Sequence, residues 1–329
     1  SKTTFLKPSL KAKTPLLIVS KQSLTSPLEF FDNSFLPSLP ANEEVAKNNE
    51  KIKTLNSLFI NMFFIVSFLK VNLYFILNLL KMRIKILINY SPNFSTYRRI
   101  RKNIKYLIYH YTGMISESKA IKRLTDVRSK VSCHYFIKRN GKIIIMVPDK
   151  FVAWHAGISS WKNKKHLNKN SIGIEINNPG HNFNYKKFSK KQVNSILNLS
   201  KILIKKYKIK NNFILGHSDI APDRKKDPGE KFPWEYFSKN KVGYWHNINP
   251  RYLVKKRNIK IDNEGKIKFI NNLHKIGYSK NFKILKTRYI KILTKAFQRR
   301  FRQNLINGII DQECLIISEN LSKKFNKTS

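Results

Sequence analysis

Two histidines and one aspartate in this sequence have the residue types and spacing of a zinc site. His110 ends the alternating stretch IKYLIYH and His217 ends FILGH, so each follows a predicted strand, where open α/β sheets commonly bind ligands. Asp227 comes ten residues after His217, on a proline-bounded loop within GHSDIAPDRKKDPG. Two neutral imidazoles and one carboxylate suit Zn²⁺ and leave a fourth position for water. The chain has eight histidines, so other trios remain open, with His134 and His155 as the main competitors.

The elements that must position these side chains are strands mixed with helices. CHYFIKRNGKIIIMV predicts two strands joined by a tight turn at Asn140-Gly141. SIGIEI places its isoleucines on one face of a strand and Glu175 on the other. Ser189 and Gln192 form a capping box, and the apolar spacing that follows predicts a helix to residue 207. The fold class expected for residues 92–245 is therefore α/β, with a mixed central β-sheet flanked by helices.

A second region follows Trp245 and a polar linker. Three stretches there carry apolar residues at helical spacing, which predicts a small three-helix bundle over residues 262–327. Its expected core positions are Phe269, Leu273, Ile276, Ile290, Leu293, Phe297, Phe301, Cys314, Ile317, Leu321 and Phe325.

The N-terminal part of the chain separates into two segments. Residues 1–54 are polar and show no sustained periodicity, which predicts poor order. Residues 55–81 are strongly apolar and long enough to cross a bilayer, but no small-residue cleavage site follows them. An uncleaved membrane anchor, a buried helix and translated sequence upstream of a start at Met82 all remain open for this segment.

The net charge of +46 also has two interpretations. It could attract a polyanion such as nucleic acid, anionic lipid or cell wall. We favour the other interpretation, a composition biased toward Lys, Asn and Ile, because the charge is spread along the whole chain whereas a binding footprint should cluster. No RNA- or DNA-binding motif accompanies the charge, so we expect no specific nucleic-acid partner. The two cysteines, Cys133 and Cys314, are too far apart in sequence for a CxxC metal site and too few for a disulfide framework.

Five motifs occur in the order that is typical of one enzyme family. IYHYTG, VSCHYFIKRNG, AWHAGIS, NKNSIGIEI and GHSDIAPDRKKDPG resemble the zinc-dependent N-acetylmuramoyl-L-alanine amidases of the AmpD type. That family shares its fold with the peptidoglycan recognition proteins, and the resemblance covers residues 92–245. The C-terminal stretch KAFQRRFRQNLINGIIDQECLIISENLSKKF further resembles the helical peptidoglycan-binding module of the AmiD branch.

The resemblance assigns a role to five residues. It places the ligands of one zinc ion per chain on His110, His217 and Asp227, and the catalytic pair on Glu175 and Lys225. A simpler alternative for Glu175 is a carboxylate in a salt bridge, and for Lys225 a solvated charge.

Three further residues are candidates for substrate binding. His155 lies in AWHAG, which suits the wall of a cleft, although a structural hydrogen bond would explain it equally well. Asn170 and Arg224 could bind the stem peptide of a peptidoglycan substrate, or its carboxylates, through planar hydrogen bonds. A turn asparagine and a surface arginine are the alternatives.

The function that the resemblance implies is hydrolysis of the amide bond between the lactyl group of N-acetylmuramic acid and L-alanine, in peptidoglycan or muropeptides. The alternative is a recognition module that binds cell wall without cutting it, although members of that class have lost a zinc ligand. We expect a monomer. An anchor over residues 55–81 would allow membrane contact and place the enzyme on the periplasmic side of the cell envelope, whereas a start at Met82 would leave it in the cytoplasm.

Overall fold

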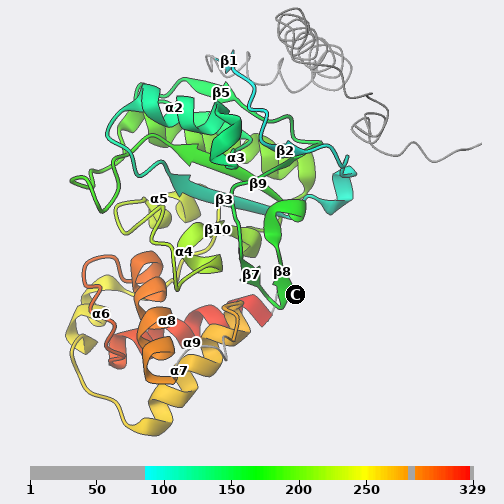
Figure 1. Cartoon of the computed structure of the whole chain (residues 1–329). Coiled ribbons are helices and arrows are strands. Elements are labelled where there is room, and N and C mark those ends of the chain that lie inside the picture. Colours follow the sequence, from blue (N-terminus) through cyan, green and yellow to red (C-terminus); the bar gives the residue numbers. More distant parts are fainter. Residues whose placement is uncertain (1–85, 281–285, 327–329) are drawn as a thin grey trace, which may run out of the picture.

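The computed structural model describes residues 86–280 and 286–326 (Figure 1). The segments 1–54 and 55–81 and the alternative start at Met82 lie outside these residues, so the expectations for them stay predictions. Across the described residues, no helix combines the length and the apolar composition needed to span a bilayer.

A six-stranded mixed sheet lies at the centre, in the order β1-β5-β4-β9-β3-β10. The β4–β5 pair is antiparallel and forms the hairpin predicted at Asn140-Gly141, while the other neighbouring pairs of this sheet are parallel. The expected α/β class with a mixed central sheet is confirmed. The strand bounds are β1 Ile86–Ile88, β3 Tyr106–Tyr111, β4 Tyr135–Ile137, β5 Ile143–Ile145, β9 Ser171–Ile176 and β10 Ile214–Gly216.

Shorter elements connect these strands. Two small antiparallel ribbons pair β2 with β6 and β7 with β8. Their bounds are β2 Phe94–Ser95, β6 Val152–Ala153, β7 Ser160–Trp161 and β8 Lys164–Lys165, and short 3₁₀ helices span Arg101–Asn103, Val127–Ser129, Leu167–Asn170 and Asn211–Phe213.

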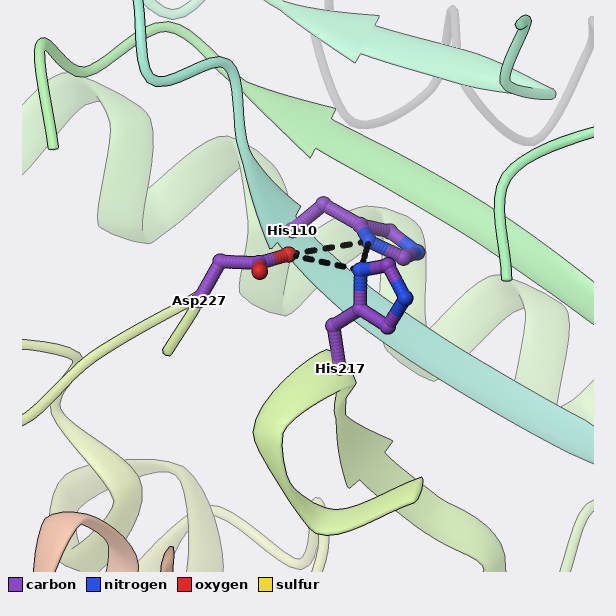
Figure 2. Close-up of side chains that lie close together, drawn as sticks. All are labelled: His110, His217 and Asp227. Atoms are coloured by element: carbon purple, nitrogen blue, oxygen red, sulfur yellow. Dashed lines mark hydrogen bonds and ion pairs between the residues drawn. The ribbon is translucent and has the colours of Figure 1, made fainter. Parts of the chain in front are cut away.

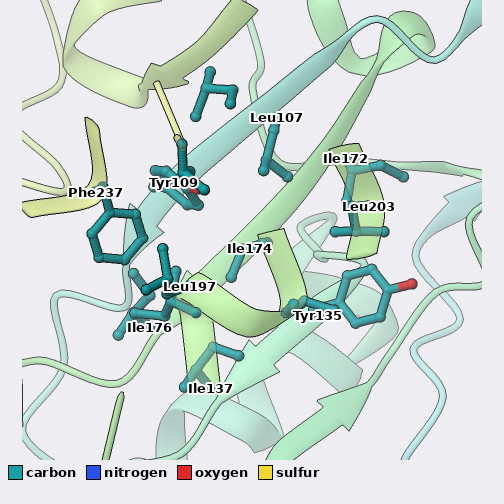
Figure 3. Close-up of a cluster of buried hydrophobic side chains, with 14 of the residues drawn as sticks. Leu107, Tyr109, Tyr135, Ile137, Ile172, Ile174, Ile176, Leu197, Leu203 and Phe237 are labelled. Atoms are coloured by element: carbon teal, nitrogen blue, oxygen red, sulfur yellow. The ribbon is translucent and has the colours of Figure 1, made fainter. Parts of the chain in front are cut away.

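One face of the sheet is covered by α3 (Lys190–Tyr207) and α5 (Trp234–Lys239). Figure 3 shows part of the apolar core between these helices and the sheet. The helix α3 begins where the sequence predicts, because the Ser189 hydroxyl accepts from the Gln192 backbone in a capping box. Side chains alternate along a strand, so every second residue of β3 and β9 points into this core. These residues are Leu107, Tyr109, Ile172, Ile174 and Ile176, which are buried, and Tyr111, which is partly buried.

The opposite face is covered at two places, by the helix α2 (Glu117–Thr125) and by the C-terminal helices. The helix α2 packs on β4 and β5, whereas the C-terminal helices pack on β3 and β10. His110 and Glu175 point to this face, because they alternate with the residues that point into the first core.

The C-terminal region contains the three helices that the apolar spacing predicts, preceded by a short one. The expected core positions are buried, with Ile290 half-buried. Their side chains join one core that also contains residues of β3 and β10, so the helices and the sheet form one packed unit (Figure 1). The helix bounds are α6 Pro250–Lys256, α7 Asn263–Ile276, α8 Lys286–Phe301 and α9 Gln312–Asn326.

This shared core predicts that the two regions unfold together. Phe297 is fully buried in it, so Phe297→Ala should lower the free energy of unfolding by about 3–5 kcal/mol and shift a single cooperative transition. Circular dichroism on heating measures this shift. Ile267→Ala is the control, because that side chain is 63% exposed and should change stability by less than about 0.5 kcal/mol. A separate early transition of the helices, with the rest of the melting curve unchanged, would contradict a shared core.

Candidate metal centre and active site

Three segments distant in sequence bring His110, His217 and Asp227 together. His110 is the next-to-last residue of β3, and its partner across the sheet is Glu175 on β9. The strand before His217 ends at Gly216, and His217 begins the one-turn helix α4 (His217–Ile220). The Asp227 loop is held against this turn, because the Ser218 amide donates to the Asp227 carbonyl at 2.8 Å.

Gly216 allows this close approach of the Asp227 loop. A Cβ atom at Gly216 would lie 2.6 Å from the Cδ atom of Pro228, far inside van der Waals contact. The glycine that opens GHSD and the proline of DPG are therefore a matched pair that places the His217 turn beside the Asp227 loop.

The three side chains converge on one point (Figure 2). The Nδ1 atoms of His110 and His217 are 2.9 Å apart, and each lies 3.0 Å from Oδ2 of Asp227. All three residues are buried. A divalent cation that prefers nitrogen and carboxylate ligands, such as zinc, fits this donor set.

The outward hydrogen bonds leave both Nδ1 atoms with a free lone pair. The Ala156 carbonyl can only accept, so Nε2–H of His217 donates to it at 3.1 Å. The Ser171 hydroxyl donates to the Leu167 carbonyl, so it accepts from Nε2–H of His155.

The same chain of bonds fixes the tautomer of His110. Nδ1 of His155 is then an acceptor, and Nε2–H of His110 donates to it at 3.0 Å. Hydrogen-bonded partners of this kind commonly orient the histidines that bind metals.

The charges at this point are those that a metal ion requires. Burial and the neighbouring His217 lower the pKa of His110 to about 4, so its imidazole is neutral near pH 7. Burial alone would raise the pKa of Asp227, but His217 and His110 hold it below the usual range, so the carboxylate is ionised. Metal ligands must be deprotonated, and these groups already are.

Glu175 and Lys225 line a cavity of about 390 Å³ together with His217 and Asp227. The Oε2 atom of Glu175 is buried and has no hydrogen-bond partner within residues 86–280 and 286–326. Burial raises the pKa of Glu175 to about 8, and the Asp227 charge acts in the same direction. A carboxyl group that titrates near neutral pH and faces a cavity is suited to moving protons.

The expected substrate-binding residues occupy different positions. His155 and Arg224 both line the cavity, but each is also engaged with the protein. His155 bonds to His110 and Ser171, and Arg224 donates to the Ala156 and Ile158 carbonyls.

Asn170 is not among the cavity residues. It directly precedes β9, at the opposite end of that strand from Glu175, and its amide donates to the Asn103 carbonyl at 3.0 Å. Its position therefore favours the structural alternative over a substrate contact.

Sequence reasoning missed other residues of this region. Arg123 on α2 also lines the cavity, but it has no distinguishing signal in a chain with 65 lysines and arginines. Ser171 directly follows Asn170, and Asp219 lies two residues after His217. Proximity to these candidate residues is the sequence signal that could have pointed to both.

Known proteins are similar to this chain in sequence. The sequence model of the family described as N-acetylmuramoyl-L-alanine amidase matches residues 100–230. The N-acetylmuramoyl-L-alanine amidase AmiD of Escherichia coli is 33% identical over 239 residues, which are 68% of this chain and 84% of that protein. The chain belongs to the N-acetylmuramoyl-L-alanine amidase family. The expected resemblance is thereby confirmed, and so is the enzyme class: the chain is an amidase that acts between N-acetylmuramic acid and L-alanine.

Solved structures of the family extend the match to the fold. The structure of AmiD of E. coli in complex with anhydro-N-acetylmuramic acid-L-Ala-D-gamma-Glu-L-Lys aligns with a TM-score of 0.60 at 31% identity, and the alignment covers 70% of this chain and 92% of the AmiD chain. AmpDh3 from Pseudomonas aeruginosa aligns with a TM-score of 0.61 at 27% identity, and the alignment covers 70% of this chain and 95% of the AmpDh3 chain. Both alignments cover more than the 100–230 segment, in agreement with one packed unit.

The close packing of His155 against Gly173 can be tested by a double-mutant cycle. A Cβ atom at Gly173 would lie 2.4 Å from the His155 ring, so Gly173→Ala should displace that ring and cost about 1–3 kcal/mol of stability. In the double variant with His155→Ala the clash is absent, so the loss of stability of the double variant should be well below the sum of the losses of the two single variants. Thermal unfolding of the four proteins in this cycle measures the coupling. Additive costs would show that the two residues do not contact.

Proposed function

We propose that this amidase is a zinc hydrolase with one zinc ion held by His110, His217 and Asp227. The observation that carries the proposal is the convergence of two Nδ1 atoms and one carboxylate oxygen, with separations of 2.9 to 3.0 Å, beside the cavity. A zinc ion at this point supplies an electrophile and a nucleophilic water near neutral pH.

Glu175 is proposed as the general acid–base. It lies beside His110 across the β3–β9 pair, and its Oε2 atom has no hydrogen-bond partner among the residues that the structure describes, which leaves it available to the reacting groups. The carboxylate takes the proton of the attacking water and delivers it to the nitrogen of the leaving L-alanine. A pKa raised by burial places both protonation states within reach near neutral pH.

Lys225 is proposed to stabilise the oxyanion that forms on the lactyl carbonyl. It lies two residues before Asp227 and lines the same cavity, half-buried. A fixed cation next to a developing negative charge lowers the barrier most in a water-poor site.

The proposed substrates are muropeptides or peptidoglycan, cut so that the stem peptide is released with a free L-alanine amino group. Stem peptides carry carboxylates, and the cavity is lined by Arg123, Arg224, Lys225 and Lys226. A basic cavity attracts such an anion and orients it. The AmiD structure that resembles this chain holds an anhydromuropeptide of this chemistry.

Metal loading tests the proposed ligands. The purified protein should contain about one zinc per chain by elemental analysis, and His217→Ala should lose most of it, because a ligand is removed. His166→Ala is the matched control, since that histidine is exposed and does not line the cavity. Full zinc content in the His217 variant would refute this metal site.

Removal of the proton carrier and of the oxyanion cation should leave zinc in place but abolish most turnover. Glu175→Gln should reduce kcat by about 10²- to 10⁴-fold, and Lys225→Ala by about 10²- to 10³-fold, on defined muropeptides. Lys201→Ala is the control, because Lys201 is exposed on α3 and does not line the cavity. Mass spectrometry of the products reads the bond: peptides that begin with L-alanine are expected, and cleavage between sugars or within the peptide would contradict the proposal.

A further inference from the structure

The residue two positions after His217 connects the metal centre to the C-terminal helices. Asp219 lies in the same single turn of helix as His217 and is 1% exposed. Its Oδ2 atom accepts from the Gly216 amide at 2.8 Å, and its Oδ1 atom accepts from the Tyr278 hydroxyl at 2.8 Å. Arg300 of α8 donates from Nη1 to the same carboxylate.

The Arg300 side chain contacts the turn and the strand that precedes it. While Nη1 bonds to Asp219, Nη2 donates to the Ile214 carbonyl of β10 at 2.9 Å. The guanidinium also lies over the Trp234 ring, 4.2 Å from its centroid. A planar fork with several donors can make these contacts at once, which a lysine ammonium cannot.

The turn that carries His217 needs such external support. It spans four residues, and one turn of helix is unstable by itself because ordering it fixes several dihedral angles for few hydrogen bonds. Asp219 and Arg300 are both buried, so removal of either partner leaves an uncompensated charge in the interior. The ion pair therefore ties the geometry of this turn to the docking of α8 beside it (Figure 1).

We propose that the C-terminal helices complete the metal centre: Arg300 and Tyr278 fix the Asp219 carboxylate, and this carboxylate holds the turn that presents His217 to the metal. Arg300 and Tyr278 are positioning residues, because they lie outside the cavity and act through Asp219. This inference rests on the proposed metal site and assigns the helices a role in the chemistry that is independent of any contact they make with polymer.

The chain offers a matched control for this role. Arg302, two residues further on, is also buried and ion-paired, but its partners Asp311 and Glu313 belong to the helical region itself. Arg302→Met and Arg300→Met each remove one buried guanidinium: Arg300 lies in the last turn of α8, and Arg302 directly follows that helix. Only Arg300→Met removes a contact to the His217 turn.

The experiment measures zinc affinity in the full chain by competition with a chelator, below the melting temperature of each variant. Arg300→Met should weaken zinc binding by about tenfold or more, as removal of outer contacts to metal ligands commonly does. Arg302→Met should leave zinc affinity within about twofold of the wild type even if it lowers the melting temperature. The absorption spectrum of the cobalt(II)-loaded protein should change in Arg300→Met and remain unchanged in Arg302→Met, because it reports ligand geometry.

Tyr278→Phe gives a second test that preserves packing, because it removes only the hydroxyl that bonds Asp219. It should weaken zinc binding by about threefold, and it decides the matter if Arg300→Met does not fold. Wild-type zinc affinity and an unchanged cobalt spectrum in the folded Arg300 variant, or in the Tyr278 variant if the former is unfolded, would overturn the inference. Equal weakening in the Arg300 and Arg302 variants would overturn it too. A wild-type protein that binds no zinc, or a His217→Ala variant that binds it fully, would instead overturn the proposed metal site.

Discussion

The buried contact of the Asp227 carboxylate with His110 and His217 is the constraint around which this fold is arranged. A carboxylate in the interior loses the solvation that water would give it, and the proposed metal ion, held by Asp227 and by the two Nδ1 atoms 3.0 Å from its Oδ2, would compensate for that loss. The three side chains come from a strand, from a one-turn helix and from a loop. Each segment must be held by contacts of its own, and those contacts account for much of the surrounding structure.

The sheet divides this work between its two faces. The face under α3 and α5 is a continuous apolar core, and its rigidity fixes the register that sets His110 beside Glu175 (Figure 3). The other face has apolar cover at two places, under α2 and under the C-terminal helices. The polar residues of the site occupy this second face, where a cavity opens beside α2.

Five acidic residues in the described part of this basic chain are buried. The chain has 19 acidic residues against 65 lysines and arginines. In the described part of the chain, each buried carboxylate contacts a cationic side chain or a histidine: Asp149 with Lys206, Asp219 with Arg300, Asp227 with His110 and His217, Asp311 with Arg302, and Glu313 with Arg257. A scarce carboxylate in a basic sequence is therefore a better indication of structural importance than any of the abundant lysines, most of which lie on the surface.

The sequence by itself determined the local elements and the chemical types at the site. The capping box at Ser189, the turn at Asn140-Gly141 and the alternation in SIGIEI are short-range patterns, and the structure reproduces each of them. The tertiary structure decided which nitrogen of each histidine faces the site, that Asn170 lies at the far end of β9, and that Arg300 reaches Asp219. These outcomes depend on segments far apart along the chain that become neighbours only after folding, and a contact of that kind leaves no periodicity or spacing for a single sequence to display.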